Sequence, residues 1–172
     1  MTLRDVKEAY PHFFAGCLGG ADCEDGWVPM IDALCKFITN EIKYSIINLQ
    51  DPHGPKDYMD LGEHVIFSFT QIKEKFGTLR AYFTCSFTKY TDLADTIRAS
   101  VPEDVYTQAT DKLYNRVSAA VSMTERMSSF TCEFSGCPGQ LCVPADAEAP
   151  TWFKTMSDTV ATDKGYRPFP RS

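Results

Sequence analysis

The first regular pattern in the chain follows Trp27. Apolar residues recur there every three, four or seven positions, which predicts a helix with a single buried stripe. The stripe comprises Trp27, Ile31, Leu34, Cys35, Ile38, Ile42 and Leu49. Pro29 fits the first turn of such a helix, because a proline there removes no intrahelical hydrogen bond. The far end stays open, since Tyr44 to Leu49 also fits an extended segment.

A strict two-residue alternation marks the middle of the chain. Apolar and polar positions alternate from Val65 to Thr70 and again from Leu79 to Cys85. Alternation of this kind predicts two strands, each with one buried face. Phe76 and Gly77 lie between them, and Gly77 can adopt the positive φ that a tight connection needs. We therefore expect an antiparallel hairpin, with Phe76 packed beneath its turn.

The helical period returns after Pro102. Ser100 and Glu103 flank this proline in a capping-box arrangement that predicts the start of a long helix, running to about Ser128. Its apolar stripe comprises Val105, Ala109, Leu113, Val117, Ala120 and Met127. Off this stripe lie Tyr106, Tyr114 and Met123. These three predict either a wider buried face or a second apolar face for another protein or a second copy of the chain.

Shorter elements complete the pattern. Residues 3–14 form a short amphipathic start, and Thr91 to Arg98 fits a short capped helix. The segment DPHGPK at 51–56 is a loop, because it combines two prolines with a glycine. We expect an exposed loop from Val143 to Pro150 and a last short helix from Trp152 to Thr162.

Together these elements predict an α+β fold, in which an antiparallel hairpin or small sheet packs against two long helices. A chain of 172 residues has the size of one domain. We therefore expect a single domain over residues 1–172, with a helix and hairpin core at 1–130 and a C-terminal segment at 131–172.

Composition restricts the class of partner and the compartment. The formal net charge of −6 makes direct nucleic-acid binding unfavourable, because an acidic surface repels a phosphate backbone. Residues 1–10 lack the continuous apolar run of a secretory signal, and charges or prolines interrupt every long apolar segment. We therefore expect a cytoplasmic protein without membrane contact.

Three motifs are more specific than these patterns. They are CEDGWVPMIDALC at Cys23 to Cys35, QIKEKFGTLRAYF at Gln71 to Phe83, and TCEFSGCPG at Thr131 to Gly139. In this order they resemble the motifs GW..LID.LC, Q.KEKFG.LR.Y and TCE.CG.PG of a family of small uncharacterised bacterial and bacteriophage proteins. A tail from Thr151 to Val160, TWFKTMSDTV, resembles the family's GW..TLC..H. The resemblance covers most of the chain, and the hairpin motif is its most specific part.

The resemblance implies a zinc knuckle near the C-terminus, since the family's motifs offer a Cys-x-x-Cys pair and a Cys-x-x-His pair. In this chain the four ligand positions hold Cys132, Ser135, Ser157 and Val160. A single thiolate cannot hold zinc in a closed tetrahedral site. We therefore expect a degenerate knuckle without a cofactor.

The cysteines allow an alternative. The chain has seven of them, an odd number, and nothing in the sequence indicates export, so we expect free thiols rather than a disulfide framework. Cys132, Cys137 and Cys142 are spaced five apart and could offer three thiolates to zinc, with a fourth ligand from Cys17 or Cys23. Otherwise they pack as small apolar side chains.

Lys73, Glu74, Lys75 and Arg80 form the densest charged cluster of the chain. One interpretation makes them a docking surface for a partner protein or an anionic ligand. The other makes them a solvated turn whose charges prevent edge pairing between chains. The sequence alone leaves both open, and these four residues are the candidate partner-binding site.

No combination of residues indicates catalysis. Glu63 and His64 are adjacent on a strand and so point to opposite faces, and no histidine is placed beside a cysteine by sequence. We therefore expect a non-enzymatic protein-binding or regulatory protein, encoded by a phage or prophage, with inhibition of a host defence or regulatory factor as one form. The alternatives are a zinc-binding structural module and an enzyme whose pocket joins a cysteine or carboxylate to His12, His53 or His64. The identity of the partner and the oligomeric state, including a homo-oligomer, stay open.

Overall fold

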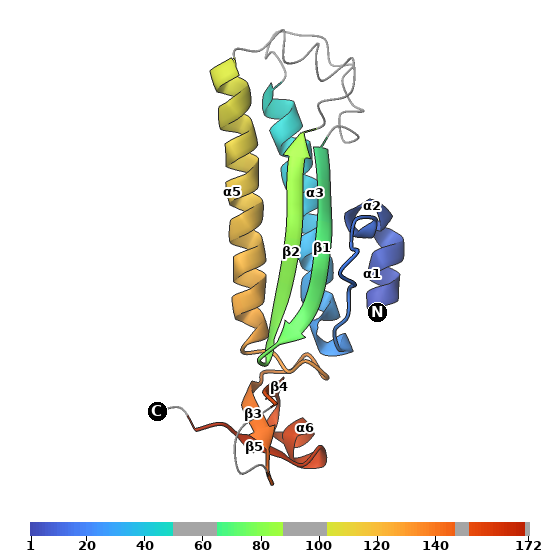
Figure 1. The fold of residues 1–172 in the computed structure, drawn as a ribbon, viewed down its shortest axis with the longest axis vertical. Coiled ribbons are helices and arrows are strands. Elements are labelled where there is room, and N and C mark those ends of the chain that lie inside the picture. Colours follow the sequence, from blue (N-terminus) through green and yellow to red (C-terminus); the bar gives the residue numbers. More distant parts are fainter. Residues whose placement is uncertain (50–64, 88–102, 147–151, 171–172) are drawn as a thin grey trace.

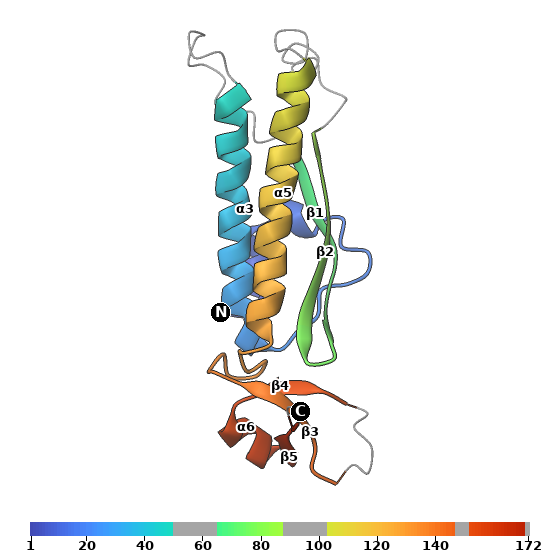
Figure 2. The same cartoon turned by 90° about the vertical axis from the view of Figure 1, so that its left-hand side faces the viewer.

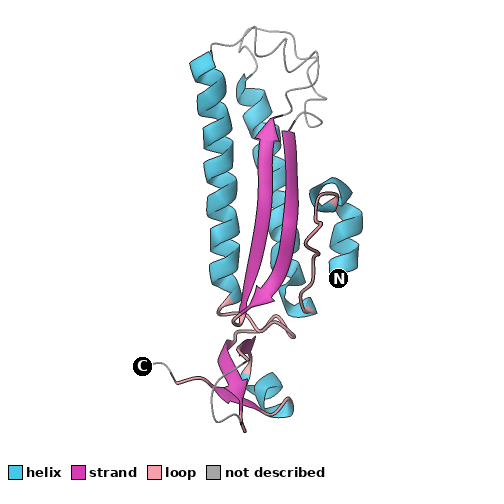
Figure 3. Cartoon of the chain, in the orientation of Figure 1, coloured by secondary structure: helices cyan, strands magenta, loops and turns pink. Residues whose placement is uncertain are grey.

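The computed structural model describes residues 1–49, 65–87, 103–146 and 152–170. The chain has an α+β fold, as its sequence predicts (Figure 1). A long two-stranded hairpin lies against two long helices, and a three-stranded sheet lies beyond the turn of the hairpin (Figure 3). The helix expected from Thr91 to Arg98, the capping residue Ser100 and the loop at 51–56 lie outside the described residues.

Two short helices begin the chain. Helix α1 (Leu3–Ala9) starts with a reciprocal capping box, and α2 (Pro11–Phe14) follows it directly. The ring of Phe13 is buried and packs edge-on against Phe67, with the ring centroids 4.9 Å apart. This contact places α2 beside the first strand of the hairpin (Figure 1).

A 3-10 turn, η1 (Asp25–Trp27), leads into α3 (Val28–Leu49), which confirms the helix expected after Trp27. The apolar stripe is buried from Trp27 to Ile42, and the Trp27 side chain is fully buried. The backbone from Tyr44 to Leu49 is helical, so the extended alternative for this segment is wrong.

Strands β1 (Val65–Lys75) and β2 (Thr78–Phe87) form the expected antiparallel hairpin. The register shifts between Phe69 and Gln71, where β1 contains a bulge. One extra residue reverses which side chains face inward. The buried face therefore carries Phe67 and Phe69 before the bulge and Ile72 after it.

The hairpin turn differs from the sequence-based expectation. Phe76 and Gly77 both have positive φ, 54° and 74°, which is the backbone geometry of a type I′ turn. The Phe76 side chain is 65% exposed at the tip of this turn. The prediction that it packs beneath the turn is wrong, because a tight two-residue connection leaves no space under its central side chains.

Helix α5 (Glu103–Ser128) lies beside α3, and both helices pack along the hairpin (Figure 2). Its stripe is confirmed at Leu113 and Val117, which are buried. Beyond them the buried face continues through Val121 and Thr124, whereas Met127 is 48% exposed. Met127 was misplaced because, at about 100° of rotation per residue, it lies to one side of the face that Val117 and Val121 define.

The second face of α5 is exposed where its side chains are described. Tyr114 and Met123 are 50% and 60% exposed, which contradicts the wider buried face. The side chain of Tyr106 lies outside the described residues. No described helix, α5 included, is long and apolar enough to cross a membrane.

The β1 edge of the hairpin is hydrogen-bonded by the loop that precedes η1. The Ile72 amide donates to the Gly20 carbonyl, and the Ile72 carbonyl accepts from the Asp22 amide, each at 3.0 Å. Ala21 thereby forms a parallel bridge with Ile72. The same loop covers part of the strand, since the Gly16 amide donates to the Ser68 hydroxyl at 3.0 Å.

The β2 edge is hydrogen-bonded by side chains of α5. The Leu79 amide donates to Ser128 Oγ at 2.8 Å, and the Ala81 amide donates to Glu125 Oε1 at 2.9 Å. Both edges are therefore hydrogen-bonded to other parts of the chain near the turn, at Ile72 on β1 and at Leu79 and Ala81 on β2. The half of the ribbon nearest the turn exposes its outer face, the side turned away from α3 and α5.

The C-terminal lobe consists of residues 131–146 and 152–170 and lies beyond the hairpin turn (Figure 1). Strand β3 (Gln140–Pro144) pairs antiparallel with β4 (Lys154–Met156) and with β5 (Tyr166–Pro168). Helix α6 (Asp158–Asp163) connects β4 to β5. The loop expected from Val143 and the helix expected from Trp152 are wrong in their first residues, since Val143 and Pro144 belong to β3 and the segment after Phe153 forms β4. Strands of three to five residues are too short to show an alternation in the sequence.

Candidate functional site

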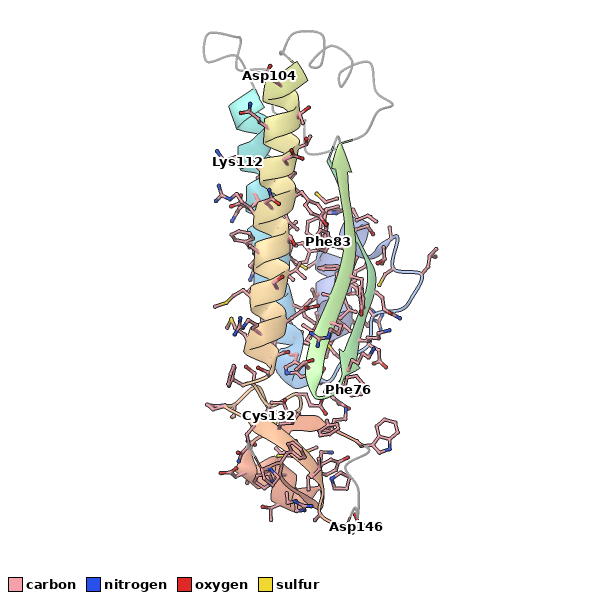
Figure 4. All side chains as sticks on the ribbon, turned by 60° about the vertical axis from the view of Figure 1, so that its left-hand side comes forward. Phe76, Phe83, Asp104, Lys112, Cys132 and Asp146 are labelled. Atoms are coloured by element: carbon pink, nitrogen blue, oxygen red, sulfur yellow. The ribbon has the colours of Figure 1, made fainter. Side chains whose placement is uncertain are left out.

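The four segments that carry the sequence motifs meet where the hairpin turn reaches the C-terminal lobe. We call this contact region the junction and define it by Gly26, Glu74, Gly77, Glu133, Lys154 and Thr155. In Figure 4 the turn, marked by Phe76, lies at the boundary with the lobe, which begins near Cys132. Segments far apart in the sequence therefore share one small region of the fold.

Backbone hydrogen bonds hold the junction together. The Gly26 amide donates to the Glu133 carbonyl at 2.8 Å, and the Glu133 amide donates to the Thr155 carbonyl at 2.9 Å. The buried Thr155 hydroxyl donates to the Gly77 carbonyl at 2.6 Å. Strand β4 thus binds both the hairpin turn and the start of the lobe.

Close packing explains the glycine and tryptophan that precede α3. A Cβ at position 26 would collide with the Cys132 carbonyl and with the Gly136 amide, both of which are backbone groups. The Trp27 indole donates to the Thr131 carbonyl at 2.8 Å. Gly26 and Trp27 therefore attach the lobe to the N-terminal end of α3.

A buried carboxylate lies at the centre of the junction. Glu133 has no exposed area, and its Oε1 lies 2.8 Å from Lys154 Nζ. Its Oε2 has no hydrogen-bond partner among the described residues. Lys154 Nζ also lies 3.6 Å from Glu74 Oε2, while Glu74 Oε1 accepts from the Gly77 amide at 2.6 Å. One lysine therefore joins a carboxylate of the hairpin to a carboxylate of the lobe.

The protonation of this cluster follows from its burial. Burial raises the pKa of Glu133 to about 7 against the opposing effect of Lys154, and Glu74 and Glu24 add to the rise. Burial lowers the pKa of Lys154, but the two neighbouring carboxylates, Glu133 and Glu74, outweigh it and raise this pKa overall. Near neutral pH, Lys154 is therefore charged, whereas Glu133 is divided between its protonated and its ionised form.

The charged cluster that the sequence singles out is divided between two sides of the ribbon. Glu74 points into the junction, where its partners are Lys154 and the turn. Lys73, Lys75 and Arg80 alternate with inward residues and lie on the opposite side, and Lys73 pairs across the strands with Arg80. Arg80 also reaches α5, with Nη1 3.5 Å from Glu125 Oε2. The four residues do not form one surface.

We define the outer face by Lys73, Lys75, Phe76, Arg80 and Tyr82. Phe76 and Tyr82 are large exposed rings, at 65% and 48% exposure. Lys73 Nζ lies 5.6 Å from the centre of the Tyr82 ring, and Lys75 Nζ lies 5.4 Å from the centre of the Phe76 ring. Among the described residues, no carboxylate forms an ion pair with either lysine. The two cations are held by rings of their own surface.

Sequence reasoning missed Glu133 and Lys154. Each lies in a motif segment, but their pairing joins positions far apart in the chain, and no local spacing reveals it. The sequence nevertheless contains a signal for both residues, because Glu133 lies between Cys132 and Phe134, and Lys154 follows Trp152 and Phe153. A charge in such a position requires a partner when it is buried.

Cys132 is the one thiol among the four positions at which the sequence suggests a zinc knuckle, Cys132, Ser135, Ser157 and Val160. Burial opposes ionisation of Cys132, but the Ser135 hydroxyl and the Ser157 amide outweigh it, so the pKa of this thiol is lowered. Val160 packs against the apolar cluster formed by Cys132, Cys142, Met156 and Ala161. Among the described residues, no three cysteine, histidine or acidic side chains are grouped so that they could hold a metal ion.

The three cysteines of the zinc alternative are separated by their environments. Cys132 and Cys142 are buried in the small apolar cluster of the lobe, whereas Cys137 is exposed. The lobe therefore packs around two thiols of this set instead of gathering all three around an ion.

The other thiols described are poor nucleophiles. Burial raises the pKa of Cys23 and Cys35 to about 12 and the pKa of Cys85 to about 11, with acidic neighbours adding to the first two. Such thiols stay protonated at neutral pH. His12 is exposed and contacts the Phe13 ring, and the other two histidines lie outside the described residues.

Comparison with known proteins found no matching protein-family model, no matching curated protein and no matching solved structure. The function is therefore inferred from the chain's own residues, above all from the junction and the outer face.

Proposed function

We propose that this protein is a non-enzymatic binding protein that contacts another protein through the outer face of its hairpin. The proposal keeps the expectation that it acts in the cytoplasm as a phage-encoded or prophage-encoded regulator of a host factor. It is carried by one observation, the division of the hairpin motif into residues that support the fold and residues that do not.

Five motif residues have a role inside the fold. They are Gln71, Glu74, Gly77, Leu79 and Arg80. Gln71 Nε2 donates to the Gly19 carbonyl at 2.8 Å, Gly77 adopts the positive φ of the turn, and Leu79 is fully buried. Glu74 and Arg80 form ion pairs with Lys154 and Glu125. Contacts within the fold therefore account for five of the nine residues that the hairpin motif specifies.

The other four motif residues are Lys73, Lys75, Phe76 and Tyr82, and their described contacts are with one another. Exposed rings beside cations contribute little to the stability of a monomer. Tyrosine and phenylalanine are, however, enriched where proteins bind one another. The exposed rings of Phe76 and Tyr82 therefore have the character of a protein-binding surface, and the two lysines beside them add positive charge to it.

Affinity capture from a lysate of the source cells tests this proposal. The bait is the full chain, compared with a variant that carries Lys73→Ser, Lys75→Ser, Phe76→Ser and Tyr82→Thr. We expect at least one protein that wild type enriches to be lost from this variant, because its contacts with the outer face are gone. Quantitative mass spectrometry of the captured proteins provides the measurement.

The matched control is Lys112→Ser with Arg126→Ser, which removes two exposed cations from α5. It should retain every partner, and both variants should stay folded, with only a small decrease in the denaturant concentration at which they unfold. Identical capture by wild type and by the outer-face variant would contradict the proposal.

A further inference from the structure

We propose that the segment bound by the outer face is an acidic peptide in extended conformation, with carboxylates at alternate positions that pair with Lys73, Lys75 and Arg80. This inference rests on the proposed function and specifies the chemistry of the partner. Three observations support this chemistry. They are the spacing of the cations, the hydrogen-bonded edges of the ribbon, and the acidic residues beside the ribbon.

The cations have the spacing of a β-strand. Lys73 and Lys75 are two residues apart on β1, so their Cα atoms lie about 7 Å apart. Arg80 lies directly across the ribbon from Lys73, at about 5 Å. Alternate side chains of an extended peptide share one side with the same repeat of about 7 Å. Carboxylates at every second residue of an extended partner therefore match the two lysines.

The partner cannot pair with the ribbon as an additional strand at Ile72, Leu79 or Ala81. Strand addition requires free backbone groups at an edge. Close to the outer face, however, the Ile72 amide is bonded to Gly20, and the Leu79 and Ala81 amides are bonded to α5. The partner must therefore be recognised through side chains across the face, where complementary charge gives specificity.

The rings prepare the cations for binding. Lys73 and Lys75 each lie over an aromatic ring of the same surface, which restricts their side chains before a partner arrives. Less rotamer freedom is then lost on binding. Arg80 is likewise positioned by Glu125 on α5.

A nucleic acid is the competing polyanion, and the surroundings of the outer face disfavour it. The protein carries a formal net charge of −6. Asp22, Glu24 and Asp25 are exposed, and the Asp22 backbone is bonded directly to β1 beside the lysines. These carboxylates repel a phosphate backbone that continues past the cations. A short acidic segment can end before it reaches them.

An NMR titration of the uniformly 15N-labelled full chain tests the inference. The probe is a synthetic peptide of alternating glutamate and threonine, and a second peptide of equal composition has its glutamates in one block. We expect saturable shifts of the outer-face amides with the alternating peptide, weaker binding of the block peptide, and weaker binding of both at high salt. Lys73→Glu with Lys75→Glu should weaken binding by about tenfold.

The control here is Lys112→Glu with Arg126→Glu, which changes net charge equally on α5 and should leave binding unchanged. Absence of saturable shifts at the outer face, or equal losses in both variants, would overturn the inference. So would tighter binding of a single-stranded oligonucleotide than of the alternating peptide. If partner capture depends on the outer face but the acidic peptide does not bind, the chemistry assigned to the partner is wrong while the proposed function stands.

Discussion

Glu74 and its two neighbours in the sequence, Lys73 and Lys75, have opposite environments. Glu74 points into the junction, where it contacts Lys154 and the turn. The two lysines point outward and are held by exposed rings. The pleat of one strand separates them, because successive side chains lie on opposite sides. The run of charges at Lys73, Glu74 and Lys75 therefore forms two groups on opposite sides of the strand, not one surface.

The two sides also differ in what their charges contribute. Ions at the junction are largely removed from water, so breaking a pair there leaves an unpaired buried charge. Charges on the outer face remain hydrated, and each contributes little to stability. Substitutions at the junction should therefore change stability, whereas substitutions on the outer face should change binding.

Gly26→Ala should produce the largest effect. The added Cβ would meet the backbone of Cys132 and Gly136, which cannot move aside without displacing the lobe. We expect the free energy of unfolding, measured by urea denaturation, to fall by about 3 kcal/mol. Gly20→Ala is the control, since no atom lies within 4 Å of its Cβ position, and its only cost is that of alanine at a positive φ. Equal losses in both variants would show that the junction contact is not responsible.

Lys154→Met should also destabilise the junction, because it leaves Glu133 and Glu74 without their shared cation. We expect a loss of about 2 kcal/mol in the free energy of unfolding above neutral pH, because the Lys154 side chain is partly exposed. Adding Glu133→Gln to this variant should recover part of the loss, since it removes the unpaired charge. A double variant no more stable than Lys154→Met would argue against the buried ion pair.

Glu133→Gln should change how stability depends on pH. The pKa of Glu133 in the folded chain is about 7, above its ordinary value of 4.5, so the folded state holds the proton more tightly than the unfolded state. This contribution to stability is fully present below pH 4.5 and is lost as the pH rises through 7. The advantage of wild type over the variant should shrink across this range by on the order of 2 kcal/mol. Denaturation curves at a series of pH values measure it, and parallel profiles for the two proteins would contradict it.

Lys73→Ser with Tyr82→Thr should have the smallest effect on stability. The pair makes one exposed cation–π contact, and threonine is well suited to a strand. We expect the free energy of unfolding to fall by about 0.5 kcal/mol. A loss as large as that of Lys154→Met would show that the outer face supports the fold, and the contrast between the two sides would fail.

The parts of the fold that could be predicted are those with a long regular period. The stripe from Trp27 to Ile42 repeats over several turns, and the alternation on either side of Phe76 extends over most of both strands. A pattern that repeats over many residues still predicts its helix or strand when single positions depart from it. The helix, the hairpin and the position of its turn follow from them.

The remainder depends on contacts that no period encodes. The exposure of Phe76 follows from turn geometry, and β4 is only three residues long. The candidate site was predicted in part for a related reason. Alternation places Lys73 and Lys75 on one side and Glu74 on the other, but the Glu133–Lys154 pair that gives Glu74 its role is formed by tertiary packing.

The indole of Trp27 spans the boundary between α3 and the lobe, and this makes the chain its own optical reporter. The protein has two tryptophans, of which Trp27 is fully buried and Trp152 is 66% exposed. Indole emission moves to longer wavelength when water reaches the ring. A shift of the Trp27 emission therefore signals that the lobe has left the helix end, and Trp152→Phe would make that signal unambiguous without any attached dye.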